Sequence, residues 1–392
     1  MSSSNTSSST AAALGAPATS PTTVSLPLPR VGSAADRAAA LPADLPAAAP
    51  DGTRPLIDRY GRVARDLRVS LTDRCNLRCT YCMPAEGLEW MPTEHTLTDE
   101  ETIRLIRLAV ERLGIRQVRF TGGEPLLRKS LEKIIAATKQ MVTDEGTAPQ
   151  TALTTNGLGL ERRIAGLKEA GLDRVNISLD TLDKELYAQL TRRDRIEDVF
   201  TAIDAAVDAG LSPVKVNAVV MPGVNEDSIL PLAEFCLRRG VQLRFIEQMP
   251  LGPRDQWHRQ QMVTAQDILD RLGEKLQLSP AAEPQGSAPA KLWSANLRED
   301  GQVITGKIGI IASVTHPFCG DCDRTRLTTD GAVRNCLFGN SETSLRDLLR
   351  AGATDDELAA AWAGEMWRKM PGHGVNDEGF LQPDRPMSAI GG

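Results

Sequence analysis

The sequence predicts an α/β fold in which a parallel sheet is covered by helices. Strand-like and helix-like patterns alternate six times between residue 67 and about residue 277, with short links between them. Glycines and polar residues gather directly after the strands, which is the edge where parallel α/β folds bind ligands. Six such units fit a partial (β/α)6 barrel of the TIM type. From the pattern alone, a doubly wound sheet remains the alternative.

Each predicted unit pairs a short apolar run with an amphipathic segment. Thr98 is the expected N-cap of the first helix, and Gly114 follows its end. The same pattern places strands at residues 67–71, 117–121, 152–155, 174–179, 214–221 and 242–246. Helices are expected at residues 98–113, 129–142, 160–170, 196–209, 227–239 and 264–275.

Composition divides the chain into three parts. Residues 1–54 are rich in Ser, Ala, Thr and Pro and carry no aromatic residue, so we expect a disordered extension. A transit peptide is the alternative, although Arg30 is the first basic residue. Residues 55–280 are expected to form the barrel, and the low-complexity stretch 281–290 opens a C-terminal α+β domain, residues 281–392.

The predicted C-terminal domain begins with two strands, at residues 291–298 and 303–314. A helical pattern runs from about residue 344 through Lys369. The chain then ends in a polar stretch and a Gly-Gly pair. For most proteins, such an end is only frayed.

The bulk composition excludes some classes of partner. The formal net charge is −6, so the chain as a whole has no attraction for nucleic acid or an anionic membrane. No apolar run approaches the length of a transmembrane helix. The seven cysteines form two groups of three, with Cys236 alone in a helical stretch. This grouping favours metal binding in a reducing compartment, and we expect a cytoplasmic protein.

The first cysteine group organises the barrel. Cys75, Cys79 and Cys82 follow the first strand in a Cys-x3-Cys-x2-Cys spacing. Three thiolates on a four-iron, four-sulfur cluster leave one iron without a protein ligand, and that iron can bind a substrate. A structural zinc site is the alternative, but it normally requires four closed ligands, and the nearest further candidate is His95.

The second group lies in the C-terminal domain. Cys319, Cys322 and Cys336 again supply three thiolates, and zinc with His316 or a redox-active pair remains open. Arg324 and Arg326 follow closely. If this stretch is extended, both guanidinium groups project to one face and suit phosphate oxygens, although a solvated edge strand would look the same.

The first motif resembles the cluster loop of the radical S-adenosylmethionine (SAM) superfamily. That resemblance implies a partial barrel, with the open iron chelating the amino and carboxylate groups of SAM. It also implies SAM contacts at Tyr81, Gly123, Ser178 and Met249.

Both cysteine groups, the Arg-Thr-Arg run and the terminal Gly-Gly together resemble the GTP 3′,8-cyclase family of molybdenum cofactor biosynthesis, over residues 55–392. The resemblance implies two [4Fe-4S] clusters, the second binding guanine. SAM would be cleaved to methionine and a 5′-deoxyadenosyl radical, which removes the 3′ hydrogen of GTP. The ribose radical would attack C8 and give (8S)-3′,8-cyclo-7,8-dihydroguanosine 5′-triphosphate.

The family's site residues map onto this sequence one by one. GTP contacts are implied at Arg68, Arg119, Thr154, Lys215, Arg324, Thr325 and Arg326. Catalytic roles are implied for Arg324, Arg326 and an inserted tail ending in Gly391 and Gly392. The implied partners are GTP, an electron donor such as flavodoxin or ferredoxin, a downstream cyclic pyranopterin monophosphate synthase and, in some cases, a second copy of the chain.

Two other functions remain compatible with the motifs. One is a radical SAM enzyme that modifies a peptide and holds an auxiliary cluster, although a peptide gives no use for the paired arginines. The other is a zinc-stabilised binding protein without catalysis.

Overall fold

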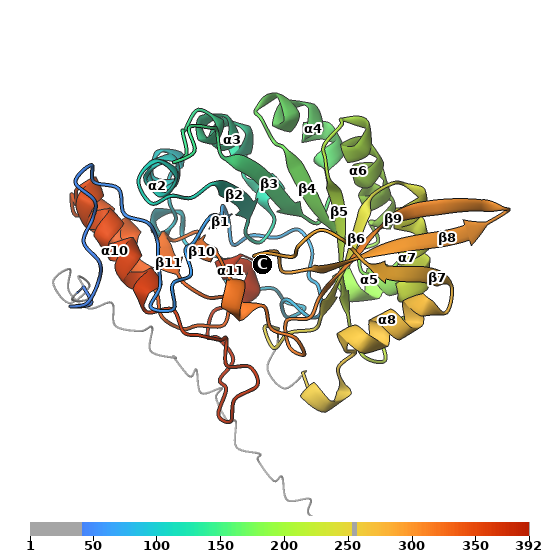
Figure 1. Cartoon of the computed structure of the whole chain (residues 1–392). Coiled ribbons are helices and arrows are strands. Elements are labelled where there is room, and N and C mark those ends of the chain that lie inside the picture. The colour runs from blue at the N-terminus through green and yellow to red at the C-terminus, as the bar shows by residue number, and fades with distance from the viewer. Residues whose placement is uncertain (1–40, 253–256, 392) are drawn as a thin grey trace, which may run out of the picture.

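One open, twelve-stranded sheet forms the body of the protein (Figure 1). The computed structural model describes residues 41–252 and 257–391. The strand order is β12-β11-β10-β1-β2-β3-β4-β5-β6-β9-β8-β7. The strands are β1 (Asp66–Ser70), β2 (Gln117–Thr121), β3 (Gln150–Thr155), β4 (Arg174–Ser178), β5 (Val214–Val220), β6 (Gln242–Glu247), β7 (Leu276–Pro280), β8 (Lys291–Glu299), β9 (Gln302–Ile311), β10 (Arg324–Leu327), β11 (Ala332–Arg334) and β12 (Thr343–Ser344).

Helices cover the outer face of the curved sheet, as Figure 1 shows for α2, α3, α4 and α6. The helices are α2 (Asp99–Glu111), α3 (Leu131–Lys139), α4 (Leu160–Glu169), α5 (Lys184–Thr191), α6 (Ile196–Asp208), α7 (Ile229–Arg238), α8 (Ala265–Gly273), α9 (Leu345–Arg350), α10 (Asp355–Trp367) and α11 (Met387–Ile390). In the described part of the chain, no helix combines the length and apolar composition needed to cross a bilayer.

The six predicted β-α units are confirmed. Strands β1 to β6 pair in parallel and in sequence order, with helices between them. Thr98 caps α2 in a reciprocal capping box with Glu101, as the sequence predicts. The helix α5 was not predicted, because it is a short element within the connection between β4 and α6.

The C-terminal part adds strands to both edges of this sheet. β9 pairs in parallel with β6, and β10 pairs in parallel with β1. The predicted boundary near residue 280 falls inside the β7–β8 hairpin, whose antiparallel strands pair across it. The Pro- and Ala-rich stretch 281–290 therefore serves as a hairpin loop. Such a composition is equally typical of a linker, and sequence alone does not separate the two.

The helical region predicted from about residue 344 through Lys369 is interrupted once. The structure contains two helices, α9 and α10, with Gly352 in the left-handed region at φ +88° between them. Thr354 then starts α10 with a capping box to Glu357. A glycine followed by a threonine N-cap indicates that one helix ends and another begins. Here that signal is decisive although the hydrophobic periodicity continues across the break.

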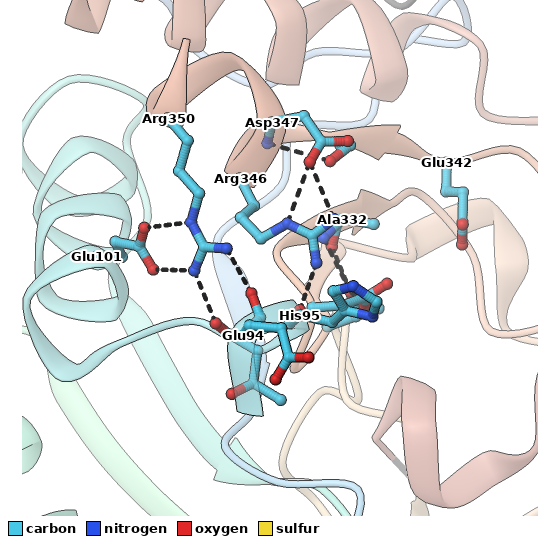
Figure 2. Close-up of polar contacts among 12 residues, drawn as sticks. Glu94, His95, Glu101, Ala332, Glu342, Arg346, Asp347 and Arg350 are labelled. Carbon is cyan, nitrogen blue, oxygen red and sulfur yellow. Dashed lines mark hydrogen bonds and ion pairs between the residues drawn. The ribbon is translucent and has the colours of Figure 1, made fainter. Parts of the chain in front are cut away.

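The short helix α9 contacts residues 94–101, which follow the first cysteine group in the sequence (Figure 2). Arg350 forms an ion pair with Glu101 at 2.7 Å and donates to the carbonyl oxygens of Glu94 and Thr96. Arg346 donates to the carbonyl oxygen of His95. These contacts join α9 to the segment before α2 and to the first turn of α2.

Residues 41–54, which the sequence assigned to a disordered extension, have defined packing partners. Leu41 lies against Gly364 of α10, and Arg54 N–H donates to the Arg112 carbonyl oxygen at 2.8 Å. Arg112 in return donates to the Gly52 carbonyl oxygen at 2.9 Å. Contacts with the end of α2 and with α10 hold this segment in place. Composition does not predict such long-range contacts. Residues 1–40 of the predicted extension lie outside the described residues.

Candidate active site

The first cysteine group lies in the loop after β1, on top of the glycines that follow β2. Gly123 N–H donates to the Thr72 carbonyl oxygen at 2.7 Å. A Cβ atom at Gly123 would lie 2.3 Å from the Arg74 carbonyl oxygen, so only glycine allows the two loops to touch. The Gly-Gly pair thus positions the backbone that carries the cysteines.

Cys75, Cys79 and Cys82 line one cavity together with the predicted SAM contacts Tyr81, Gly123 and Ser178. We call it the cluster cavity. Burial raises the pKa of all three thiols, and raises that of Cys82 to about 12. Deprotonation of these three adjacent buried thiols is therefore unfavourable in the protein alone. A bound metal centre would supply the positive charge that makes deprotonation favourable.

Buried carboxyl groups support the walls of the cluster cavity. Glu124 accepts hydrogen bonds from the backbone N–H groups of Leu126 and Asn156 and from the Thr155 hydroxyl. Burial raises its pKa to about 7. The Tyr81 hydroxyl donates to Asp180 at 2.9 Å, and burial raises the pKa of Asp180 to about 6. These bonds hold the loops between strands in fixed positions.

A second cavity adjoins the first and is strongly cationic. Alternation along β1 puts Asp66 and Arg68 on one face, and the register sets Arg68 beside both Arg119 of β2 and Arg326 of β10. This cationic cavity is lined by Arg68, Arg119, Thr154, Arg244, Met249, Arg324 and Arg326, and by all three cysteines of the second group. The two cavities share wall residues, namely Tyr81, Thr154, Ser178, Asp180 and Met387.

The positive charges of this cavity are poorly compensated by the protein. Within the described residues, the buried Nε atoms of four arginines that line this cavity have no hydrogen-bond partner, namely Arg68, Arg119, Arg244 and Arg324. Burial and the neighbouring Arg326 lower the pKa of Arg68 well below its usual range. Although burial opposes it, the charges of Arg119 and Arg68 hold the pKa of Asp66 below its usual value. Unpaired buried cations are costly, so the cavity suits an anionic ligand.

Lys215 belongs to the same group of charges although it does not line either cavity. It stands on β5 in register with Asn176 of β4. Burial, followed by the charges of Arg244 and Arg174, lowers its pKa to about 7. Of the three arginines whose charges lower the pKa of Lys215, Arg119 is also a predicted GTP contact.

Thr325 corrects one predicted contact. Arg324 and Arg326 face the cationic cavity, so Thr325 between them points to the opposite face of β10. Its hydroxyl accepts a hydrogen bond from the Trp362 indole at 3.0 Å, under α10. The Thr325 side chain therefore packs α10 onto the sheet and does not line the cationic cavity.

Sequence reasoning missed Arg244 and the loop 281–290. Arg244 lies on β6 two residues before Ile246, and both line the cationic cavity. An arginine between two apolar residues, Leu243 and Phe245, was the available signal. Pro289 lines the cavity and the carbonyl oxygen of Ser287 accepts from Arg324, because the hairpin folds back over the site. The local sequence contains no signal for that return.

The second cysteine group is surrounded by cations. Lys369 Nζ donates to Cys322 Sγ at 3.3 Å, and Arg324 approaches the same sulfur at 3.6 Å. Although burial opposes it, these two charges lower the pKa of Cys322. Arg62 donates to the Cys319 carbonyl oxygen at 2.6 Å and is paired with the buried Asp58. Neither Lys369 nor Arg62 stands in a recognisable motif.

The C-terminal tail enters the concave side of the sheet, where α11 lies in Figure 1. Met387 and Ser388 line the cluster cavity. Arg326 donates to the carbonyl oxygen of Gly391, whose φ is +73°. A Cβ atom there would lie 2.5 Å from Ser70 Oγ and 2.7 Å from a methyl carbon of Thr121. Gly392 lies outside the described residues.

Comparison with known proteins identifies the family. A model of the radical SAM superfamily matches residues 69–236, and a model described as Molybdenum Cofactor Synthesis C matches residues 241–375. A Corynebacterium glutamicum (strain R) protein named GTP 3′,8-cyclase is 73% identical over 342 residues, 87% of this chain and 90% of that one. The chain belongs to the GTP 3′,8-cyclase family.

Further members of the GTP 3′,8-cyclase family align over a similar length. A Mycobacterium sp. (strain KMS) protein of that name is 56% identical over 347 residues, 88% of this chain and 96% of that one. Among solved structures, native anSMEcpe with bound AdoMet is 19% identical, with a TM-score of 0.44 over 53% of this chain and 61% of that chain.

Membership of the GTP 3′,8-cyclase family makes the chain a radical SAM enzyme and implies SAM and [4Fe-4S] clusters as cofactors. The residues present fit these groups. All seven cysteines are free thiols, and six of them face the two adjoining cavities. Within residues 41–252 and 257–391, no three His, Cys, Asp or Glu side chains converge on a site for one metal ion. A [4Fe-4S] cluster binds each thiolate through a different iron, so its ligands need not converge in this way.

Proposed function

We propose that this chain converts GTP to (8S)-3′,8-cyclo-7,8-dihydroguanosine 5′-triphosphate, the first step of molybdenum cofactor biosynthesis. The observation that carries the proposal is the cationic cavity, next to both sets of three cysteines. Among its described lining residues, five arginines outnumber one carboxylate, Asp180. A triphosphate supplies the missing negative charge. A non-catalytic zinc protein is excluded by the family, and a peptide substrate would leave these charges unpaired.

The proposed metal ligands are the two cysteine groups. Cys75, Cys79 and Cys82 would hold the cluster that binds SAM, and Cys319, Cys322 and Cys336 would hold the auxiliary cluster. When bound, the first cluster and SAM supply a carbon radical that removes the 3′ hydrogen of GTP. Tyr81, Gly123 and Ser178 line the cavity for SAM, whereas Met249 lines the adjoining cationic cavity.

The proposed role of the cations is to hold and orient GTP. Arg68, Arg119 and Arg326 stand side by side on three neighbouring strands, and forked guanidinium groups suit phosphate oxygens. Arg324 and Arg244 line the same cavity. Because the cationic cavity opens into the cluster cavity, the ribose can lie next to SAM while the phosphates remain among the arginines. The shared walls also exclude water from a radical intermediate.

The tail would complete the site from its open side. The Gly391 carbonyl oxygen already accepts from Arg326, and Met387 lines both cavities. Reduction must come from an electron donor such as flavodoxin or ferredoxin, and we propose that the product passes to a cyclic pyranopterin monophosphate synthase.

Anaerobic incubation of the reconstituted protein with SAM, a reductant and GTP tests the proposal. We expect 5′-deoxyadenosine and the cyclised nucleotide to form together in a constant ratio. The reconstituted protein should contain about eight irons per chain, for two [4Fe-4S] clusters. Replacing Cys75, Cys79 and Cys82 by Ala should halve the iron content and abolish SAM cleavage. Cleavage of SAM without any cyclised nucleotide, with both clusters intact, would contradict the assignment of GTP as substrate.

A further inference from the structure

Lys369 is a buried cation that the proposed reaction leaves unexplained. It follows the C-terminal end of α10, and its side chain is almost fully buried, with the residue 4% exposed. Its ammonium group donates to Cys322 Sγ at 3.3 Å, to the Cys322 carbonyl oxygen at 3.2 Å and to the Arg324 carbonyl oxygen at 3.0 Å. These three acceptors use all three N–H donors of a lysine.

Of the three groups that accept hydrogen bonds from Lys369, only the Cys322 sulfur can carry a negative charge. The other two acceptors are neutral carbonyl groups, and no ion pair with a carboxylate is found for Lys369 in the described part of the chain. A buried ammonium group without a counter-charge is costly, and in most proteins it is paired. The Cys322 thiolate is the group within reach that can carry the compensating charge.

The other cation near Cys322 has a different position. Arg324 approaches the sulfur at 3.6 Å, lies over the Phe318 ring and donates to the Ser287 carbonyl oxygen. Its guanidinium group lines the cationic cavity and is proposed to bind phosphate. Lys369 does not line that cavity. It is therefore not among the cations proposed to bind phosphate.

We propose that Lys369 is the fixed counter-charge of the auxiliary cluster. It stabilises Cys322 as a thiolate ligand and makes the cluster easier to reduce, because a positive charge and an N–H···S bond both favour the more negative state. This inference rests on the assignment of Cys319, Cys322 and Cys336 to that cluster. Through the Arg324 carbonyl oxygen, Lys369 also ties the cluster loop to β10, which carries the phosphate-binding arginines.

The test uses the full chain with Cys75, Cys79 and Cys82 replaced by Ala, so that only the auxiliary cluster contributes. Iron content and the electron paramagnetic resonance signal are followed during a redox titration without GTP. In Lys369→Met and Lys369→Gln, we expect the ratio of reduced to oxidised cluster at a given potential to fall at least tenfold. That change equals about 59 mV for a one-electron couple. Lys369→Arg keeps the charge and should stay within threefold of the parent.

A matched control replaces an exposed lysine, Lys307→Met, which should leave the titration unchanged. Loss of the cluster in the Met and Gln variants but not in Lys369→Arg would also support a requirement for the charge. An unchanged titration in both neutral variants would overturn the proposal. So would equal loss of the cluster in Lys369→Arg, because the lysine would then only shape the loop. Retention of the signal after Cys322→Ala would instead refute the cysteine assignment.

Discussion

The face of the strand on which a side chain lies decides whether it lines the cationic cavity or packs against a helix. Arg324 and Arg326 face the cavity, whereas Thr325 between them supports α10. The same alternation on β6 brings Arg244 into the cavity. Roles can therefore be assigned at the residue scale once the inward face of each strand is known.

Removing both guanidinium groups of β10 should weaken GTP binding strongly. In Arg324→Ala/Arg326→Ala, we expect a loss of about 1.5–3 kcal/mol per side chain, because each makes charge-assisted bonds to phosphate. Iron content should not change. Equilibrium binding of GTP to the anaerobic protein measures the effect, with Arg162→Ala, an exposed arginine, as control. Unchanged GTP affinity in the double variant would show that these arginines do not bind phosphate.

Lys215 predicts a pH dependence of GTP binding. Its pKa of about 7 is below that of a free lysine, so the free protein loses this charge as the pH rises above 7. A bound triphosphate raises the pKa again, so binding takes up a proton. Affinity should therefore fall as the pH rises from 7 to 9, by at most about tenfold per pH unit.

Calorimetry in two buffers of different ionisation enthalpy measures that proton uptake. Lys215→Met should bind GTP more weakly at pH 7 and should lose the uptake that the parent shows at pH 8. The titration of the γ-phosphate contributes equally to both proteins, so the difference isolates Lys215. Identical proton uptake in the two proteins would contradict the assignment.

At the scale of elements, the tail is held in place by close packing of glycine. Gly391 lies in the left-handed region and touches Ser70 and Thr121, so a side chain there meets two strands. We expect Gly391→Val, or deletion of residues 391–392, to reduce cyclisation sharply with little change in iron content or GTP affinity. Comparing the yields of 5′-deoxyadenosine and cyclised nucleotide measures this.

A synthetic peptide with the native tail sequence should restore part of the activity of the truncated enzyme. Ala360→Val, at a partly buried position of α10 that lines neither the cluster cavity nor the cationic cavity, serves as control. Full cyclisation by the truncated chain would show that the tail is only a frayed end.

At the scale of the whole molecule, residues 41–54 of the predicted N-terminal extension pack against α2 and α10. A chain beginning at Leu41 should match the full-length protein in stability and activity. A chain beginning at Pro55 loses the hydrogen bonds of Arg54 and Gly52 with Arg112, and the packing of Leu41 on α10. We expect it to lose about 1–3 kcal/mol of stability while still cyclising GTP.

Denaturant unfolding of the two truncated chains checks this, with iron content as the control for intact clusters. Equal stability of both would show that residues 41–54 contribute nothing to the folded state. A large loss of activity with intact clusters in the longer truncation would contradict the prediction that the extension is dispensable for chemistry.

The sequence by itself determined the local features of this protein. Three cysteines within eight residues reach one centre without help from the rest of the chain, and the six strand–helix alternations follow from hydrophobic periodicity. Polar residues at strand ends were predictable for the same reason, since parallel strands place those ends at one edge.

Only the tertiary structure decided which distant residues meet. β10 lies beside β1 although more than 250 residues separate them, and this brings Arg68 next to Arg326. Lys369, just after α10, donates to Cys322, and the 281–290 loop accepts from Arg324. No sequence motif predicts either contact. Such contacts depend on long-range strand pairing and on burial of a charge, and neither is encoded by local spacing.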